Sequence, residues 1–232
     1  MEVLGMEPSV AMQEYLAEAY RIHYYQTDDQ YISTSALADT MHVSAPAVTR
    51  MVQRLKEADF LDHEPYRGIK LTRKGELEAL AYIRKHRIVE RFLVDAMGFG
   101  WHQVHDLADE MGPSVTDRVV ERMNEMVGYP RRCAHGEPIP HADGTMPRVV
   151  DYLLTDAELG KTYIVSRANT HDEEKLVYLD TLGIKPGVHL KLVERAPFNG
   201  PLHLEVNGKP CFIGHELSSV IRVCSQQEFE LV

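Results

Sequence analysis

Several residue types and motifs are scarce in this sequence, and each scarcity excludes a class of protein. Only three of the 232 residues are cysteines, Cys133, Cys211 and Cys224, and no two form a CxxC pair. Neither a disulfide framework nor a zinc ribbon is therefore supported. No run of about eighteen apolar residues marks a membrane span. The N-terminus lacks the basic and apolar regions of an export signal, so we expect a cytoplasmic protein without a membrane partner.

Motifs of the common enzyme classes are also absent. The sequence contains no HExxH, no nucleophile elbow and no glycine-rich phosphate loop. A metal hydrolase could use His86, Glu90 and His105 with an open coordination position, but none of these motifs supports it. We therefore expect a protein that is not an enzyme.

Charge is distributed unevenly along the chain. The net charge is −10, from 25 Lys and Arg against 35 Asp and Glu, yet residues 44–91 hold eleven basic and seven acidic side chains. The 44% hydrophobic content is that of an ordinary globular protein. One basic segment in an acidic protein indicates a surface that faces phosphates.

The first 76 residues have the pattern of a winged helix-turn-helix. An amphipathic helix is predicted from Ser9 to about Gln26, and a short one, capped by Ser33 or Thr34, ends near Met41. Ser44 then caps a helix with Pro46 in its first turn. Two short strands follow, joined by a turn at residues 66–68, and they form the wing.

Such a unit offers a surface for double-stranded DNA. Small residues at the start of its second helix allow close approach, and the arginines behind them can reach phosphates or guanine edges. The candidate DNA-binding residues are Ser44, Pro46, Ala47, Thr49, Arg50 and Arg54 on this helix, with Arg67 and Lys70 in the wing. The alternative is a protein-docking module whose arginines are merely solvated.

The remainder of the chain predicts helices and then strands. Helices are expected over residues 76–97, 102–111 and, capped by Ser114, 115–127; their surplus apolar surface suits a dimer interface. A segment rich in Pro, Gly and His follows and is expected to skirt the surface. Alternating strands, an Asn207-Gly208 turn and a short helix before them predict a small barrel. The predicted domains are a winged helix at residues 1–76, a helical dimerisation domain at 77–130, a linker at 131–154 and a small β-barrel at 155–232.

Two histidines precede an acid by four residues, His86 before Glu90 and His105 before Asp109. Positions i and i+4 lie on one face of a helix, so each pair presents an imidazole and a carboxylate to a common point. This spacing suits metal ligands, and it also suits an ordinary solvated salt bridge.

The motifs SAPAVTRMVQRL, GIKLTRKG, RKHRIVERFL, VHDLADEMG and GEPIP, in this order, resemble those of the diphtheria toxin repressor and manganese transport regulator family. The resemblance covers essentially the whole chain and is most specific over residues 44–125. It implies a mainly α fold with a C-terminal all-β domain, in which the helical domain binds metal and the barrel is SH3-like and FeoA-like. It also implies a homodimeric repressor of metal-uptake genes that binds a palindromic operator when Fe²⁺ or Mn²⁺ is bound.

The resemblance assigns two metal sites. The first takes His86, Glu90 and His105, with a barrel carboxylate at or near Asp172. The second takes Glu14 and Asp109 but expects Glu and His where this chain has Gly112 and Pro113. Glu110 or Glu18 could replace the missing ligands, or the site is weak or relies on water.

The same resemblance bears on the choice of metal. By this resemblance, iron-responsive relatives have Met and Cys where this chain has Glu14 and Asp109. These two acids are hard oxygen ligands, which suit Mn²⁺. We therefore favour Mn²⁺ over Fe²⁺ and expect Zn²⁺ or Co²⁺ to bind in vitro. Acids that repel one another without metal would leave the winged helices loose, and metal would fix their separation. The rival is a winged-helix regulator that senses an organic ligand.

Overall fold

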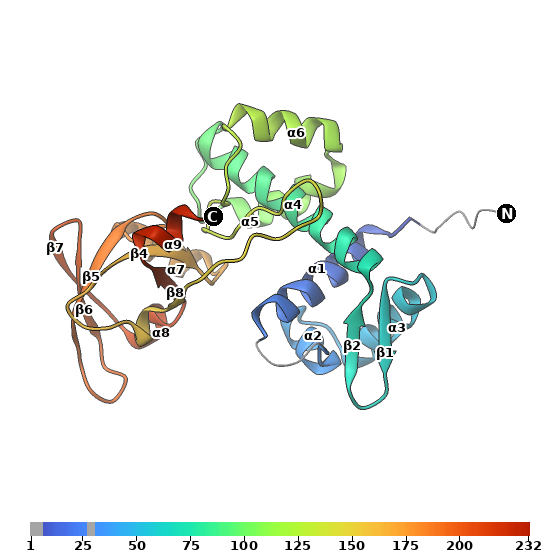
Figure 1. Cartoon of the computed structure of the whole chain (residues 1–232), viewed down its shortest axis with the longest axis horizontal. Coiled ribbons are helices and arrows are strands. Elements are labelled where there is room, and N and C mark those ends of the chain that lie inside the picture. The colour runs from blue at the N-terminus through green and yellow to red at the C-terminus, as the bar shows by residue number, and fades with distance from the viewer. Residues whose placement is uncertain (1–6, 27–30) are drawn as a thin grey trace. The chain divides into compact units, whose positions relative to one another are not determined.

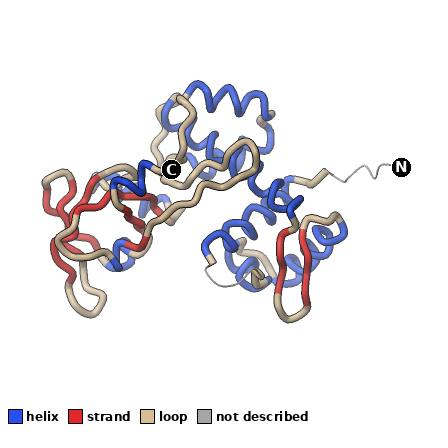
Figure 2. Tube along the Cα trace, viewed as in Figure 1, coloured by secondary structure: helices blue, strands red, loops and turns tan. Residues whose placement is uncertain are grey.

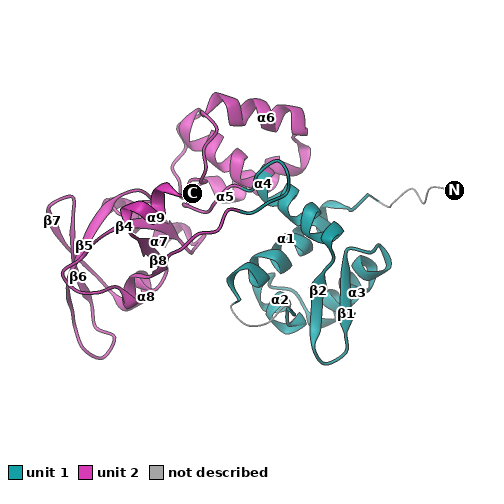
Figure 3. Ribbon diagram, in the orientation of Figure 1, with its two compact units in different colours: residues 1–84, 140–146 teal, residues 85–139, 147–232 magenta. Residues whose placement is uncertain are grey.

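The computed structural model describes residues 7–26 and 31–232, which form two compact units. The N-terminal unit comprises residues 1–84 with 140–146, and the C-terminal unit comprises residues 85–139 with 147–232 (Figure 3). Within the described residues, no helix is both long and apolar enough to span a bilayer.

The N-terminal unit is the predicted winged helix, with three helices, a hairpin and the start of a long helix (Figure 1). Its elements are α1 (Val10–Tyr25), α2 (Thr34–Thr40), α3 (Ala45–Glu57), β1 (Leu61–Glu64), β2 (Gly68–Leu71) and the first half of α4 (Arg73–Asp95). Ser9 caps α1 and Ser33 caps α2 through their side chains, as short polar residues at these positions predict. Leu16, Phe60 and Ile69 are fully buried in its core.

The wing is fixed by a glycine. β1 and β2 pair antiparallel from Leu61 opposite Leu71 to Glu64 opposite Gly68. Gly68 has φ +120°, and a Cβ there would lie 2.3 Å from the carbonyl oxygen of Ile32. Only glycine fits this close approach, so the turn brings the wing against the residues before α2.

The C-terminal unit begins with helices that surround the second half of α4. They are α5 (Val104–Met111), the 3₁₀ turn η1 (Gly112–Ser114) and α6 (Asp117–Met126). The prediction that Ser114 caps the last helix is wrong, because Ser114 ends η1 and Thr116 is the N-cap. η1 ends at Ser114, and α6 begins at Asp117.

The rest of the C-terminal unit is built around a six-stranded antiparallel sheet in the order β3-β8-β4-β5-β6-β7; Figure 2 colours the strands red. Its elements are β3 (Tyr152–Leu153), η2 (Leu154–Asp156), β4 (Thr162–Ala168), α7 (Glu173–Thr181), β5 (His189–Arg195), β6 (Leu202–Val206), β7 (Lys209–Ile213), α8 (His215–Ser218), β8 (Ile221–Cys224) and α9 (Gln226–Glu230). The Asn207-Gly208 turn forms as predicted, with positive φ at both residues. The helix expected before the barrel, α7, instead comes between strands of the barrel along the chain, because β3 and β4 precede it.

The expectation that residues 128–147 skirt the surface is wrong for their middle part. Cys133 and His135 are 2% and 1% exposed, and Ile139 is also buried. We call residues 131–139 the strap. Ile139 packs with Ile88 of α4 and Val120 of α6, so the strap is part of the core.

Candidate metal centre

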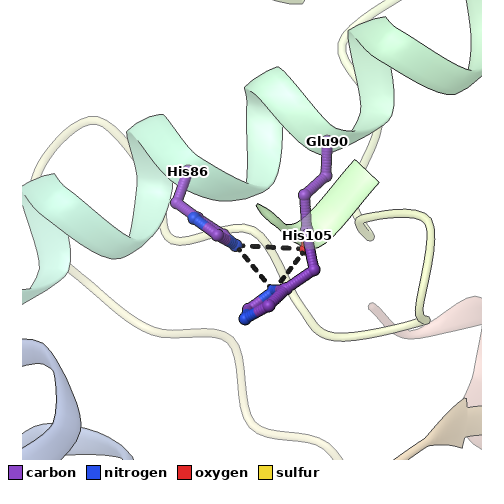
Figure 4. Close-up of side chains that lie close together, drawn as sticks. All are labelled: His86, Glu90 and His105. Carbon is purple, nitrogen blue, oxygen red and sulfur yellow. Dashed lines mark hydrogen bonds and ion pairs between the residues drawn. The ribbon is translucent and has the colours of Figure 1, made fainter. Parts of the chain in front are cut away.

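Three side chains from α4 and α5 meet at one point in the C-terminal unit (Figure 4). His86 and Glu90 lie one turn apart on α4, and His105 comes from α5. His86 Nε2 lies 3.1 Å from Glu90 Oε1 and 3.2 Å from His105 Nδ1, and His105 Nδ1 lies 3.2 Å from Glu90 Oε1. The predicted helix spacing thus places His86 beside Glu90, and the packing of α5 on α4 brings His105 to them.

The triangle formed by these three atoms has the size of a metal coordination face. Two donors at right angles about a metal, each about 2.1 Å from it, lie about 3.0 Å apart. Because all three separations are close to this value, the atoms fit as ligands with little movement.

The strap adds two further donor residues. His135 Nδ1 lies 3.2 Å from Glu90 Oε1, and Cys133 forms a compact group with these two residues, with one ligand atom from each within 4.8 Å of the others. His135 Nε2 donates to the carbonyl oxygen of Trp101 at 2.8 Å. Since a carbonyl only accepts, this bond places a proton on Nε2 and directs Nδ1 toward Glu90, which is the orientation a ligand needs.

Glu90 is 2% exposed, and the charged groups in contact with its carboxylate are histidines. Burial alone would raise the pKa of Glu90, but the charges of His86 and His135 and hydrogen bonds from His105 and His135 hold it well below the ordinary value. Burial likewise acts to lower the pKa of His135, but Glu90 and Cys133 raise it to about 11. Without metal, a protonated imidazole thus neutralises the buried carboxylate.

Burial also affects the thiol of the strap. Desolvation, with a smaller contribution from the Glu90 charge, raises the pKa of Cys133 above its ordinary value. A metal ligand must be a thiolate, so binding at Cys133 releases a proton.

Asp109 lies on the outer side of the two helix-borne histidines. Its carboxylate is 2.9 Å from His86 Nδ1 and 3.6 Å from His105 Nε2, and its side chain is 51% exposed. Glu90 and Asp109 therefore contact opposite nitrogens of each ring. A carboxylate in this outer position orients imidazoles for a metal and makes them more basic.

At the barrel, the residue beside the cluster is His171. Its ring stacks on His105 with centroids 3.5 Å apart and lies 5.7 Å from the His135 ring. Asp172 instead caps α7, where it accepts from the Lys175 backbone at 3.1 Å and pairs with the Lys175 side chain at 3.8 Å. The barrel thus brings an imidazole to this place, and the ligand role expected of Asp172 stays a prediction.

The predicted second site is not assembled within either unit. Glu14 is an exposed residue of α1 in the N-terminal unit, whereas Asp109 belongs to the C-terminal unit. Gly112 and Pro113 form η1 and offer no ligand atom from a side chain.

The candidate DNA-binding residues of α3 share one exposed part of the N-terminal unit. Ser44 is the N-cap, Pro46 lies in the first turn, and Thr49, Arg50 and Arg54 are exposed, while Ala47 is half-buried. Val48, Val52 and Leu55 face the core. The helix therefore separates an apolar inner face from a polar outer face.

The wing residues are engaged by their neighbours. The Arg67 guanidinium lies 4.0 Å from the centre of the Tyr31 ring and 3.1 Å from Glu64 Oε2. Tyr31 also donates to Glu64. Lys70 of β2 is half-buried and lines a cavity of about 290 Å³ with His23 and Glu76. Arg67 consequently also braces the wing.

Sequence reasoning missed Cys133, His135 and His171. The signal for the first two was a Cys-x-His tract in a loop rich in Pro and Gly, which is a metal-binding composition. The isolated His171 offered no such signal, because only the folded barrel brings it beside His105.

Family comparisons agree with this architecture. Residues 9–69 match the model "Iron dependent repressor, N-terminal DNA binding domain", and residues 72–141 match its "metal binding and dimerisation domain". Residues 152–224 match the FeoA domain. A solved structure described as a manganese-dependent transcriptional repressor in complex with manganese is 32% identical, with a TM-score of 0.83 over 92% of this chain and 99% of that one. The chain belongs to the diphtheria toxin repressor family.

Other members of the diphtheria toxin repressor family are similar over nearly their whole length. The iron-dependent repressor IdeR of Mycobacterium tuberculosis is 26% identical over 220 residues, which is 89% of this chain and 95% of the relative. The diphtheria toxin repressor of Corynebacterium efficiens is 25% identical over 218 residues, or 89% and 94%. The structure of ScaR with bound Zn²⁺ is 28% identical, with a TM-score of 0.73 over 94% of this chain and all of that one. This chain is thus a metal-dependent transcriptional repressor.

Proposed function

We propose that this repressor responds to Mn²⁺, acts as a homodimer and binds a palindromic operator that controls metal uptake. One observation carries the metal response: the buried carboxylate of Glu90 has nitrogens of His86, His105 and His135 within 3.2 Å. Burying several imidazoles around one acid is unfavourable for packing a hydrophobic core, but these side chains are suitable metal ligands.

Glu90, His86 and His105 are proposed as ligands, joined by Cys133 and His135 of the strap. Glu90 supplies a buried carboxylate at the centre of the cluster. Trp101 holds His135 through Nε2, and Asp109 orients the two helix-borne imidazoles from outside. A bound divalent cation would displace the proton of His135 and compensate the buried carboxylate.

The preference for Mn²⁺ rests on Glu14 and Asp109. By the family resemblance, iron-responsive relatives carry sulfur at these two positions. Carboxylate oxygens bind Mn²⁺ in preference to softer ions. The 32% identity to a manganese-dependent repressor supports the same choice. The thiol and imidazoles around Glu90 would also bind Zn²⁺ and Co²⁺ in vitro.

The DNA and dimer contacts follow from the two exposed surfaces. Arg50 and Arg54 project from α3, whose small N-terminal residues permit close approach to a major groove. Val119 and Met126 of α6 are 46% and 58% exposed, which provides apolar surface for a second copy. A two-fold dimer would present two recognition helices to the two halves of a palindrome.

The test measures operator binding by the apo-protein against free Mn²⁺, Fe²⁺ and Zn²⁺ under anaerobic conditions. We expect Mn²⁺ to activate binding fully and a chelator to reverse it. Arg50→Ala should weaken operator binding while metal affinity and dimer mass stay unchanged. Binding that ignores the chelator would contradict a metal response, and activation by Fe²⁺ alone would contradict the choice of Mn²⁺.

A further inference from the structure

The strap carries Cys133 and His135 but belongs to no helix or strand. Within it, the Cys133 backbone N–H donates to the Glu137 carbonyl at 2.9 Å, and the Gly136 N–H donates to the Cys133 carbonyl at 3.1 Å. These bonds shape a turn but do not place it in the unit. Its position beside Glu90 must come from contacts outside the strap.

Glu137 lies between arginines from two different elements. Arg87 of α4 approaches Glu137 Oε2 at 3.3 Å and also donates to the Pro138 carbonyl at 2.5 Å. Arg167 of β4 donates to Glu137 Oε1 at 3.0 Å and to Oε2 at 3.2 Å. The side chains of Arg87, Arg167 and Glu137 are only 6%, 4% and 13% exposed, so solvent screens these pairs weakly. One carboxylate thus joins the strap to both the helix and the barrel.

The backbone of the strap also touches β4. The Ala168 N–H donates to the His135 carbonyl at 3.0 Å. A Cβ on Gly136, which has φ +91°, would lie 2.2 Å from the Ser166 carbonyl oxygen. Because the strap packs this closely on β4, a shift of its turn relative to β4 moves His135.

The same charge network continues into the barrel. Asp151 accepts from Arg167 Nε at 2.8 Å and Nη2 at 3.0 Å, and Arg222 Nε donates to Asp151 at 2.5 Å. Arg222 therefore holds the barrel end of the network, as Arg87 holds the strap end. The two arginines provide a matched pair for experiment.

We propose that Glu137 is a positioning residue for metal binding, which joins Arg87 to Arg167 and so holds the Cys133–His135 turn against Glu90. This proposal rests on the proposed ligand roles of Cys133 and His135. Arg87 directly follows the ligand His86 on α4, so the link ties the strap to the part of the helix that carries the first ligands. Without the Glu137 charge, two buried guanidiniums would lack their common partner and draw the strap out of place.

A purely structural role of Glu137 would lower the free energy of unfolding without a specific loss of metal affinity. The two roles are separated by comparing Glu137→Gln and Arg87→Gln, which break the strap link, with Arg222→Gln, which removes a charge of the same network within the barrel. Each full-length variant is titrated with Co²⁺ alone, under anaerobic conditions. The titration records the Co²⁺ affinity and the absorption band from thiolate-to-Co²⁺ charge transfer, called the thiolate band below. Unfolding by urea is measured for each variant.

We expect both strap variants to bind Co²⁺ about 10- to 100-fold more weakly, as for other residues that orient ligands, and to lose most of the thiolate band. Arg222→Gln should lose stability yet keep the affinity and the band. Retention of both properties in Glu137→Gln or Arg87→Gln overturns the proposal, as does an equal loss in Arg222→Gln. Should Glu137→Gln not fold, Arg87→Gln gives the same decision. A wild-type complex without a thiolate band would instead overturn the ligand role of Cys133 itself.

Discussion

The two halves of the metal centre are built by different means. His86, Glu90 and His105 project from α4 and α5, and hydrogen bonds along the helix backbone set their positions. Cys133 and His135 project from a strap that side-chain ion pairs and close backbone packing hold in place. The helix-borne half is thus fixed locally, whereas the strap-borne half depends on residues distant in sequence. Each can be disturbed without the other, except at Glu90.

The largest effect is expected where the two halves share a ligand. Glu90→Gln removes the carboxylate that contacts His86, His105 and His135. We expect affinity for both Mn²⁺ and Co²⁺ to fall about 100-fold or more, because the cluster loses its central charge. Calorimetric titration measures this loss, with Asp106→Asn on the exposed face of α5 as the control. Unchanged affinity for either metal would contradict the shared role of Glu90.

A smaller effect is expected when the strap is displaced without touching a ligand. Gly136→Ala places a methyl group against the Ser166 carbonyl and forces alanine to adopt φ +91°. The expected cost is about 1–3 kcal/mol of unfolding free energy, with loss of the thiolate band of the Co²⁺ complex. Gly160→Ala is the control, since its φ is +78° but nothing lies within 4 Å of the added Cβ. Equal behaviour of the two variants in the Co²⁺ spectrum would show that the strap tolerates movement.

The halves should also differ in the metals that they favour. Cys133→Ser replaces sulfur by oxygen in the strap, so Co²⁺ and Zn²⁺ affinity should drop about tenfold while Mn²⁺ affinity changes less. His105→Ala, in the helix-borne half, should weaken all three ions. Competition against a chromophoric chelator measures each affinity. An equal loss of affinity for Mn²⁺ and Co²⁺ in Cys133→Ser would contradict a difference in metal preference between the two halves.

The last effect concerns pH. The pKa of His135 is raised to about 11 in the metal-free protein, so its imidazole carries a proton at neutral pH that a metal must displace. Metal affinity should therefore rise with pH, by up to about tenfold per unit for this one proton. Titrations at several pH values, compared between the wild type and His135→Gln, isolate this contribution. A wild-type slope no steeper than that of the variant would show that His135 releases no proton.

The sequence predicted what local periodicity determines. The i, i+4 spacing placed His86 and Glu90 on one face of α4, and the cap at Ser33, the wing turn and the Asn207-Gly208 hairpin formed where their residues indicated. The strap was mistaken for a surface linker, because its burial depends on contacts such as that between Glu137 and Arg167. β4 was missed because it is buried along nearly its whole length and shows no alternation.

The Glu137–Arg167 contact also bears on the order of events during synthesis. Residues 86, 90 and 105 leave the ribosome well before residue 167, and α4 and α5 can form while the barrel is still incomplete. The strap can settle only after β4 has been made and has paired with β5 and β8, whose last residue is Cys224. A nascent chain would therefore hold the helix-borne donors alone, and complete metal capture would wait until nearly the whole polypeptide has been translated.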